Sequence, residues 1–377
     1  MSAEPEEIVR RRSRVGGRTV LIAVVAIAVV AVVLLYGAFA GWFGGGPITL
    51  VGAGATFPFP LISKWSSVYV NRTGVRVNYQ AIGSGGGIAQ ITARTVDFAG
   101  SDAPLSPTER AAAPGLLHVP ETIGAVTAAY NLPGISTGLN LTGPVLVEIF
   151  RGNVTMWSDP SIANLNSAVP LPAQAISVVH RSDGSGTTFV WTNYLHRANA
   201  GGWGTSLVGK SISWPVGSGQ LGNSGVAAYI IQHPGAIGYV ELAYTVQNSM
   251  TDAKVRNPAG SFILPSLNST AAAAEGAAPS LPAPDADWSQ VSILDAPGPD
   301  SYPISSFTYL LVYKELTVIG SSMTQTKAKA LVDFLWWAVH DGQNYSADLV
   351  YVPLAQAVVD IDAFALQSIR YNGQPLR

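Results

Sequence analysis

The longest hydrophobic stretch of the chain lies near its N-terminus. No residue from Thr19 to Phe43 is charged, and most residues of this stretch are aliphatic. A helix of about 20 such residues spans a bilayer. Five Arg precede the stretch, and basic flanks of this kind stay in the cytoplasm. The pattern therefore predicts a cytoplasmic basic segment at 1–18 and a single-pass transmembrane helix at 19–43, with the rest of the chain outside the cytoplasm.

A cleaved signal peptide is the alternative interpretation of this stretch. Ala38-Phe39-Ala40 has the small residues typical of a cleavage site. The apolar run is longer than the about 7–15 residues usual in a signal peptide, which favours an uncleaved anchor. Both interpretations place the remaining chain in the same compartment. Because the chain has no Cys, a lipid-modified cysteine cannot be the anchor.

Short hydrophobic segments follow the glycine-rich residues 44–47. Alternating apolar residues predict strands, whereas apolar residues three or four positions apart predict helices. Strands are expected at 48–51, 75–79, 96–99 and 176–179, and helices at 59–71, 88–94, about 187–198 and 327–340. Strands alternating with helices and glycine-rich loops are typical of an α/β sheet protein. Ligands of such sheets bind beyond the carboxyl ends of the strands, where these loops lie.

Two later segments add to this pattern. Residues 267–286 are rich in Ala, Pro and Ser, which predicts a short helix capped by Asn268 or Ser269 and then a surface loop. The helix expected at 327–340 contains Trp336 and Trp337, and we expect both side chains in the core.

Composition narrows the classes of protein that fit. A length of 377 residues suits two domains, and 48% hydrophobic against 12% charged residues is typical of a globular chain. Without the five Arg and three Glu of residues 1–18, the chain keeps 16 basic and 20 acidic residues. This balance argues against nucleic-acid binding, which needs dense Lys and Arg. No metal or cofactor motif is present, and the formal GxGxxG match at 217–222 lacks the acidic residue that a dinucleotide site requires.

Three glycine-rich segments place Ser or Thr where helices are expected to begin. They are Gly54–Phe57, Gly83–Gly87 and Asp183–Thr188. A helix N-terminus has unpaired N–H groups and roughly +0.5 of an elementary charge, and glycine lets a ligand approach these donors closely. Together with the hydroxyl groups, the three segments predict an anion site that needs no basic surface. Each hydroxyl has the alternative role of an ordinary N-cap.

Two charged residues add specificity to this prediction. The planar guanidinium of Arg181 matches two oxygens of a tetrahedral oxyanion, although a structural ion pair is the alternative. Asp102 follows an expected strand. A carboxylate beside an anion is repulsive unless the ligand carries a proton, as phosphate does near neutral pH and sulfate does not. A buried Asp102 would therefore select phosphate. The alternative is that Asp102 is an ordinary cap or turn residue.

Several runs of sequence together resemble the phosphate-binding proteins of phosphate ABC transporters. They are VGAGATFPFPLISKW, VNYQAIGSGGGIAQI, VDFAGSDAPLS, HRSDGSGTTFVWTNYL and HPGAIGYVELAY, in the family's order between about Leu50 and Tyr244. The run WPVGSGQLGNSGVAAYI also fits, and the C-terminal part matches more loosely. The resemblance implies that phosphate is bound by Thr56, Phe57 (through its N–H), Ser84, Asp102, Arg181, Ser185, Gly186 and Thr187. Gly85 departs from the family pattern, in which Ser often follows the first loop serine.

The resemblance also implies an architecture and a role. It implies an α/β, two-lobed periplasmic-binding-protein fold (type II-like), with a hinge and a ligand cleft between the lobes. Lobe I would comprise 44–121 and 302–377, and lobe II 122–301. The protein would capture inorganic phosphate outside the cytoplasm and deliver it to the permease and ATPase subunits of an ABC transporter, with no cofactor and no catalysis of its own.

Three alternatives to this role remain at the level of sequence. A phosphate-ester hydrolase could use a serine of the same site, although no general base, metal motif or GxSxG motif is evident. The site could instead bind another oxyanion such as sulfate. A sensor or surface antigen could bind phosphate without delivering it.

Overall fold

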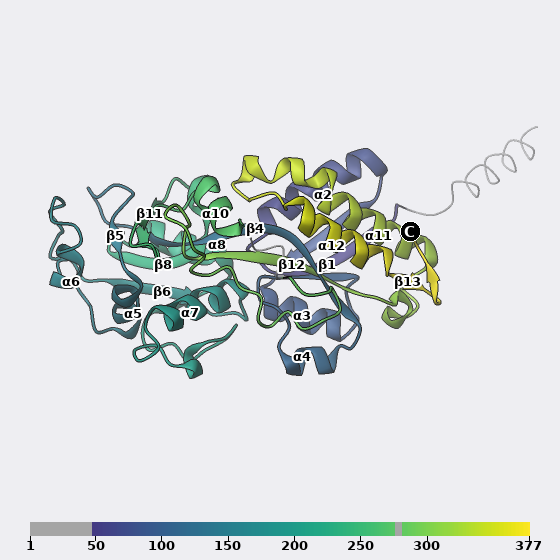
Figure 1. Ribbon diagram of the computed structural model, residues 1–377, viewed down its shortest axis with the longest axis horizontal. Coiled ribbons are helices and arrows are strands. Elements are labelled where there is room, and N and C mark those ends of the chain that lie inside the picture. Colours follow the sequence, from purple (N-terminus) through teal and green to yellow (C-terminus); the bar gives the residue numbers. More distant parts are fainter. Residues whose placement is uncertain (1–46, 276–280) are drawn as a thin grey trace, which may run out of the picture. The chain divides into compact units, whose positions relative to one another are not determined.

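A computed structural model describes residues 47–275 and 281–377 (Figure 1). The expected basic segment 1–18 and transmembrane helix 19–43 lie outside these residues. Within the two described ranges, no helix is both long and apolar enough to cross a membrane.

Strands and helices alternate through the first half of the fold. The elements in order are β1 (Thr49–Gly54), α2 (Phe59–Thr73), β2 (Arg76–Ala81), α3 (Ser84–Thr92), β3 (Phe98–Ser101), α4 (Pro107–Ala112), β4 (Leu116–Tyr130), β5 (Asn140–Leu141), α5 (Gly143–Arg151), α6 (Pro160–Ala163), β6 (Ser177–Arg181) and α7 (Gly186–Ala198). The second half contains β7 (Ser218–Gln220), α8 (Gly222–Gln232), β8 (Ala236–Glu241), α9 (Leu242–Gln247), β9 (Thr251–Asp252), β10 (Lys254–Arg256), β11 (Phe262–Ile263), α10 (Leu267–Ala274), β12 (Ser305–Tyr313), α11 (Gln325–Val339), α12 (Gln356–Gln367), β13 (Arg370–Tyr371) and β14 (Gln374–Pro375). The expected α/β class is thereby confirmed.

One nine-stranded sheet organises the unit Thr49–Arg377. Its strand order is β2-β1-β3-β12-β4-β8-β6-β7, with β9 added beside β4. The strands β1, β2 and β3 are parallel to one another, as are β6, β7 and β8, whereas β12 is antiparallel to both β3 and β4. We call β1–β3 the first half-sheet and β6–β8 the second half-sheet.

Strand β4 joins the two half-sheets. All of its residues are buried; 116–120 and 122–125 pair with β12, with a register shift at Glu121, and 126–130 pair with β8 (Figure 1). The expected lobe boundary between Glu121 and Thr122 falls inside β4, and the second boundary, between Ser301 and Tyr302, falls just before β12. The segments expected to connect the lobes are therefore the two long central strands. The exact limits of the lobes stay a prediction.

All four expected strands begin one or two residues later than predicted and end two or three residues later. Strand β1 continues to Gly54, where it pairs with both β2 and β3; Gly52 lies against the ring of Phe98, which would be 2.3 Å from an added Cβ atom. Strand β3 begins at Phe98 and not at Val96, and the preceding residue Asp97 is bonded to Val51 through both its backbone N–H and its side chain. Asp97 Oδ2 accepts a hydrogen bond of 2.7 Å from Val51 N, and Lys327 pairs with the same carboxylate. Side-chain contacts of this kind leave no alternating pattern in the sequence.

Helix α10 has a different cap from the one expected. Ser266 is the N-cap; its hydroxyl accepts from Ser269 N, while Ser269 Oγ accepts from Ser266 N. This reciprocal pair is a capping box, in which Ser269 occupies the third helical position. In α11, Trp337 is buried as expected, but Trp336 is only partly buried and stacks on His340.

Candidate anion-binding site

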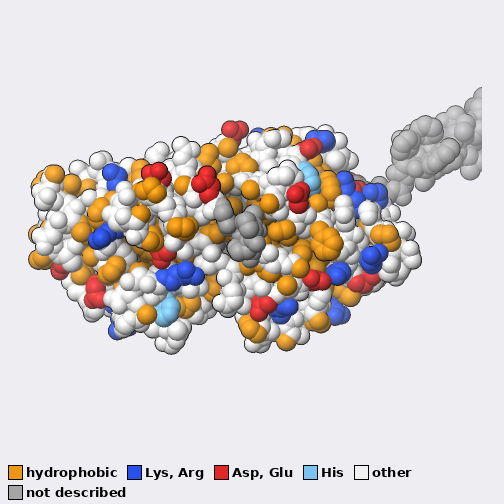
Figure 2. Space-filling view, viewed as in Figure 1, with side chains coloured by type: hydrophobic (Ala, Val, Ile, Leu, Met, Phe, Trp, Pro, Cys, Tyr) orange, Lys and Arg blue, Asp and Glu red, His pale blue; other side chains and the backbone are white. Residues whose placement is uncertain are grey.

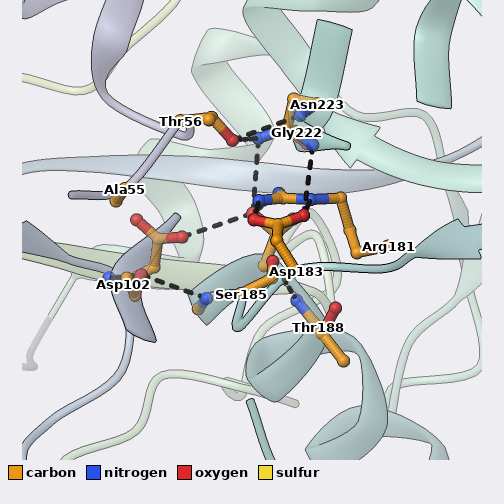
Figure 3. A network of polar contacts seen from close by, with 12 residues as sticks. Ala55, Thr56, Asp102, Arg181, Asp183, Ser185, Thr188, Gly222 and Asn223 are labelled. Carbon is orange, nitrogen blue, oxygen red and sulfur yellow. Dashed lines mark hydrogen bonds and ion pairs between the residues drawn. The ribbon is translucent and has the colours of Figure 1, made fainter. Parts of the chain in front are cut away.

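The carboxyl ends of three strands carry the predicted site residues. Thr56 follows β1, Asp102 follows β3, and Arg181 is the last residue of β6, with Ser185 in the loop after it. The parallel strands of each half-sheet end at one edge, so their following loops gather there. Figure 3 shows Thr56 and Asp102 toward the guanidinium end of Arg181. The expected position of the glycine-rich loops is thereby confirmed.

Ser84 links the first half-sheet to the second. It is the first residue of α3, fully buried, and its Oγ accepts hydrogen bonds from Gly186 N at 3.0 Å and Asp102 N at 3.2 Å. A hydroxyl that accepts in both bonds keeps its own hydrogen to donate. The position of Gly186 requires glycine, because an added Cβ would lie 2.5 Å from Ser84 Oγ and 2.7 Å from Asp102 Oδ2.

Asp102 is surrounded by donors. Its side chain is 1% exposed; Oδ2 accepts from the Thr187 hydroxyl at 3.2 Å, and Oδ1 accepts from the Thr308 hydroxyl at 3.2 Å. Burial raises the pKa of Asp102 to about 7, although Arg181 and the two threonine hydroxyls favour the charged form. Asp102 is therefore a buried hydrogen-bond acceptor, and its role toward a ligand stays a prediction.

Arg181 is oriented by a neighbouring carboxylate. Its Nε donates to Asp183 Oδ1 at 2.7 Å and its Nη2 donates to Asp183 Oδ2, while Nη1 donates to Thr187 Oγ1 at 3.4 Å. Burial alone would raise the pKa of Asp183, but the Arg181 guanidinium holds it below its ordinary value. The guanidinium thus serves as an ion-pair partner on one edge and faces Thr187 with the other.

The N-cap alternative applies to only one of the three loops. Ser185 is the N-cap of α7, and its Oγ accepts from Thr188 N at 3.0 Å. The cap positions of α2 and α3 are Pro58 and Gly83, neither of which makes a side-chain capping bond. Thr56 and Ser84 are therefore buried hydroxyls that do not cap the helices following them; they accept instead from the first-turn N–H groups of α8 and α7.

The remaining predicted residue, Phe57, is anchored by packing. Its ring is fully buried and lies 6.4 Å from the ring of Tyr351, whose hydroxyl donates to the Phe57 carbonyl at 2.7 Å. These contacts fix the loop after β1. Thr56, Ser84, Asp102, Arg181, Gly186 and Thr187 belong to one hydrogen-bond network, while Phe57 and Ser185 are chain neighbours of its members.

Asn223 completes this network and was not predicted from the sequence. It lies near the start of α8 and is fully buried. Its Nδ2 donates to Thr56 Oγ1 at 3.0 Å and to Thr187 Oγ1 at 3.3 Å, and its backbone N also donates to Thr56 Oγ1. Its Oδ1 accepts from Glu241 N. The run LGNSGVAAYI was a usable signal, because Gly-Asn at a helix start places a polar amide at the same sheet edge.

The face of the molecule shown in Figure 2 has no basic patch gathered over one element. Basic and acidic side chains are interspersed on this face. Among residues 47–275 and 281–377, no group of three or more His, Cys, Asp and Glu side chains could hold a metal ion. The chemistry of the site is therefore that of buried hydroxyls, backbone N–H groups, one guanidinium and one carboxyl acceptor.

Comparison with known proteins identifies the family. Residues 43–340 match the family model described as a PBP superfamily domain. The phosphate-binding protein PstS of Pasteurella multocida is 43% identical over 317 residues, which cover 82% of this chain and 88% of that protein.

Solved structures show the same fold at lower identity. A high-affinity periplasmic phosphate-binding protein bound with phosphate has a TM-score of 0.66 at 22% identity, covering 84% of this chain and 92% of that one. A putative phosphate ABC transporter substrate-binding protein from Clostridium perfringens, with bound phosphate, has a TM-score of 0.58 at 16% identity, covering 81% and 100%. The sequence and fold matches together show that the chain belongs to the PstS family of phosphate-binding proteins, as its sequence motifs predicted.

Proposed function

We propose that the chain binds inorganic phosphate at the hydrogen-bond network around Asp102 and delivers it to an ABC transporter. The observation that carries the proposal is a buried carboxyl, Asp102, placed among the donors Ser84, Arg181 and Thr187. Donors hold the ligand oxygens, while the carboxylate accepts a proton that only a protonated oxyanion provides. The PstS relatives are named for phosphate binding, which supports the same ligand.

When phosphate binds, some hydrogen bonds inside the protein would be replaced by hydrogen bonds to phosphate oxygens. Gly186 N and the hydroxyls of Thr56, Ser84, Ser185 and Thr187 would donate to phosphate oxygens, together with Phe57 N. The free edge of Arg181 would supply positive charge that Asp183 does not fully neutralise. Three helix N-termini, of α2, α3 and α7, add roughly +0.5 of an elementary charge each. The positive charge of Arg181 and of the helix N-termini together offsets the negative charge of Asp102.

Selectivity for phosphate over sulfate follows from the Asp102 carboxylate, which accepts a hydrogen bond from the ligand. Sulfate has no hydrogen to donate near neutral pH, so it would bring its oxygens against the Asp102 carboxylate. Sites that bond a ligand hydroxyl reject analogues lacking it by about 10⁴–10⁵-fold. The family is one of substrate-binding proteins and not of enzymes, which removes the phosphate-ester hydrolase as a function.

Delivery requires the lobes to close over the ligand. Contacts between the predicted lobes support this step: Gly85 N donates to the Gly184 carbonyl at 2.7 Å, and Lys210 Nζ lies 2.7 Å from Glu109 Oε2. Closure of this kind around a hinge excludes water from the ligand and presents a distinct surface to a partner. The proposed partners are the permease and ATPase subunits of the transporter.

We place the binding unit outside the cytoplasm, held by the helix expected at 19–43. Its support is the uncharged stretch between Thr19 and Phe43 with basic residues before it. Protease treatment of intact cells tests this placement. Digestion of residues beyond 47 with protection of 1–18 is the expected result, whereas release of the whole protein into the medium would contradict an uncleaved anchor.

Calorimetric titration of the purified full chain tests the ligand. After removal of phosphate by dialysis against a phosphate-scavenging system, we expect saturable 1:1 binding of phosphate at pH 8. Sulfate, added at the same concentration and ionic strength, serves as the matched anion. Absence of phosphate binding would refute the proposed function, and sulfate binding of equal strength would refute the role of Asp102.

A further inference from the structure

The Thr308 hydroxyl lies between two buried carboxyl groups. Its Oγ1 is 3.2 Å from Asp102 Oδ1 and 3.1 Å from Glu121 Oε1. Thr308 and Glu121 have no exposed surface, and Asp102 is 1% exposed. The three residues come from β12, β4 and the turn after β3, which are neighbours in the central sheet. Glu121 is the one acidic residue of β4.

The number of hydrogens available between Thr308 Oγ1, Asp102 Oδ1 and Glu121 Oε1 limits which of the two carboxyl groups can be ionised. A hydroxyl has one hydrogen, so Thr308 donates to one carboxyl only. It can bond the second carboxyl only by accepting a hydrogen from it. Both short distances are hydrogen bonds when either Asp102 or Glu121 is protonated. Two neighbouring carboxyls in a buried site also resist simultaneous ionisation.

The surroundings assign the proton to Glu121. Asp102 is stabilised as an anion by Arg181 and by the Thr187 hydroxyl. Glu121 lacks such support: its Oε2 is buried and has no hydrogen-bond partner among the described residues, and the charged group that acts on it is Asp102, of the same sign. Burial and the nearby Asp102 raise the pKa of Glu121 to about 8, although the hydrogen bond with Thr308 acts in the opposite direction.

The other groups around Glu121 do not change this assignment. Gln343 Nε2 donates to the Glu121 backbone carbonyl and not to its carboxyl group. Tyr79 on β2 donates its hydroxyl to the Ala55 carbonyl, and burial together with Glu121 and Asp102 raises the pKa of Tyr79 well above its ordinary value. Tyr79 therefore stays neutral and adds no charge next to Glu121.

We propose that Glu121 is a positioning residue that keeps a proton, donates it to Thr308 Oγ1 and thereby directs the Thr308 hydroxyl to Asp102 Oδ1. The proposal rests on the proposed binding of phosphate at Asp102. It leaves Asp102 Oδ2 to accept the phosphate proton and keeps a second negative charge away from the ligand. Loss of the Glu121 proton would add that charge and let Thr308 turn away from Asp102, so phosphate affinity would fall.

A Glu121→Gln variant tests the proton directly. The glutamine amide can donate to Thr308 but cannot ionise, so it imitates the protonated acid. Infrared difference spectra of the full chain, wild type minus variant at pH 7, should show loss of a protonated-carboxyl C=O band that shifts in D₂O. Loss of carboxylate bands instead would overturn the proposal. This spectrum needs no ligand, so it tests Glu121 even if phosphate binding itself fails.

Phosphate titrations at several pH values test the consequence. The ratio of the wild-type Kd to the Glu121→Gln Kd cancels the titration of phosphate itself. We expect this ratio to be near unity at pH 6 and to rise to about tenfold at pH 9.5, when Glu121 ionises beside the site. A ratio that stays constant across this range would overturn the proposal, as would a variant about tenfold weaker than wild type at pH 6. Glu148→Gln, at a carboxylate bonded to Asn153 far along α5, is the control and should show a constant ratio.

Thr308→Val tests the intermediate hydroxyl. The near-isosteric valine removes the donor to Asp102 Oδ1, and a buried acceptor without its donor weakens the arrangement, so phosphate Kd should rise by about tenfold. Adding Glu121→Gln to Thr308→Val should then change the pH dependence less than it does in the wild type, since the connection through the hydroxyl is broken and only the charge of Glu121 remains. Thr192→Val is the matched control, because Thr192 is equally buried but donates to the Phe189 carbonyl. A pH-dependent effect of Glu121→Gln that persists undiminished in the Thr308→Val background would contradict the role of the threonine.

Discussion

Thr187 Oγ1 donates a hydrogen bond of 3.2 Å to Asp102 Oδ2, although the two residues are 85 positions apart in the sequence. Thr187 is the second residue of α7, which follows a strand of the second half-sheet, whereas Asp102 directly follows a strand of the first. The bond therefore joins the two predicted lobes at the proposed phosphate site. It also shows Asp102 acting as an acceptor for a hydroxyl, which is the role proposed for it toward phosphate.

Arg181→Ala should weaken phosphate and sulfate binding alike. The substitution removes a charged donor, and it leaves Asp183 as an unpaired carboxylate beside the ligand. A hydrogen bond to a charged group is worth about 1.5–3 kcal/mol, so Kd should rise about tenfold to a hundredfold for either anion. Calorimetry measures both values. Arg72→Ala, which removes an exposed ion pair with Asp341, is the control and should bind as wild type. An Arg181→Ala variant that loses phosphate but not sulfate affinity would contradict a purely electrostatic role.

Sulfate should bind more tightly at acidic pH. Burial raises the pKa of Asp102 to about 7, so its carboxyl is increasingly protonated below that pH and can donate to a sulfate oxygen. Above pH 7 the carboxylate repels sulfate. We expect sulfate Kd to fall by about tenfold or more from pH 8 to pH 5.5, since one unit of pKa corresponds to about 1.36 kcal/mol.

Competition against a labelled phosphate reports the sulfate affinity. The Asp102→Asn variant is the control, because its side chain does not titrate and its sulfate affinity should vary little with pH. Equal sulfate affinity of the wild type at both pH values would show that Asp102 does not control discrimination.

Asn223→Ala should weaken phosphate binding without unfolding the protein. Asn223 Nδ2 bonds both Thr56 and Thr187, so its loss frees two hydroxyls to rotate away from the ligand. The expected rise in phosphate Kd is about tenfold, the value of one or two buried hydrogen bonds. Asn248→Ala, which removes a bond to the Tyr244 carbonyl, is the matched control. Phosphate affinity that is unchanged in Asn223→Ala would exclude Asn223 from the site.

Glu109→Gln should accelerate phosphate release. The Lys210–Glu109 pair links α4 to the loop before β7, and the Lys210 carbonyl accepts from Ser185 N at the start of α7. A partly exposed pair contributes about 0.2–1 kcal/mol, so the dissociation rate should rise by about twofold to fivefold. Stopped-flow release into a phosphate trap measures this rate. Raising the salt concentration should accelerate release from the wild type more than from the variant. A salt effect of equal size in both proteins would argue against the pair as a closed-state contact.

The sequence was sufficient for the family and for the loops that carry the site. Strand-then-glycine patterns placed Thr56, Ser84 and Ser185 at the carboxyl edge of the sheet, where the structure has them. The assignment of individual ligand residues came from the family resemblance and stays a prediction. Local pattern was enough here because a helix start after a strand is a short-range feature.

Residues that act through distant partners could not be predicted. Asn223 reaches Thr56 across 167 positions, and Thr308 reaches Glu121 across 187. The spacing of residues along the chain does not predict contacts between residues so far apart. Glu121 did leave a signal, because a single acidic residue in the buried run of β4 must be either paired or neutral. The sequence places Arg181 two residues before Asp183 but does not predict that their side chains form an ion pair.

The measurement that tests the central claim most directly is the ratio of sulfate Kd to phosphate Kd for the wild type and for Asp102→Asn at pH 8. The wild-type ratio should be about 10⁴ or larger, because sulfate cannot donate to the carboxylate. The Asn variant offers an amide donor in its place, so its ratio should fall by about a hundredfold or more, while Asp360→Asn, at an exposed carboxylate bonded to Gln356, keeps the wild-type ratio. A ratio that is the same in Asp102→Asn and the wild type would contradict the account.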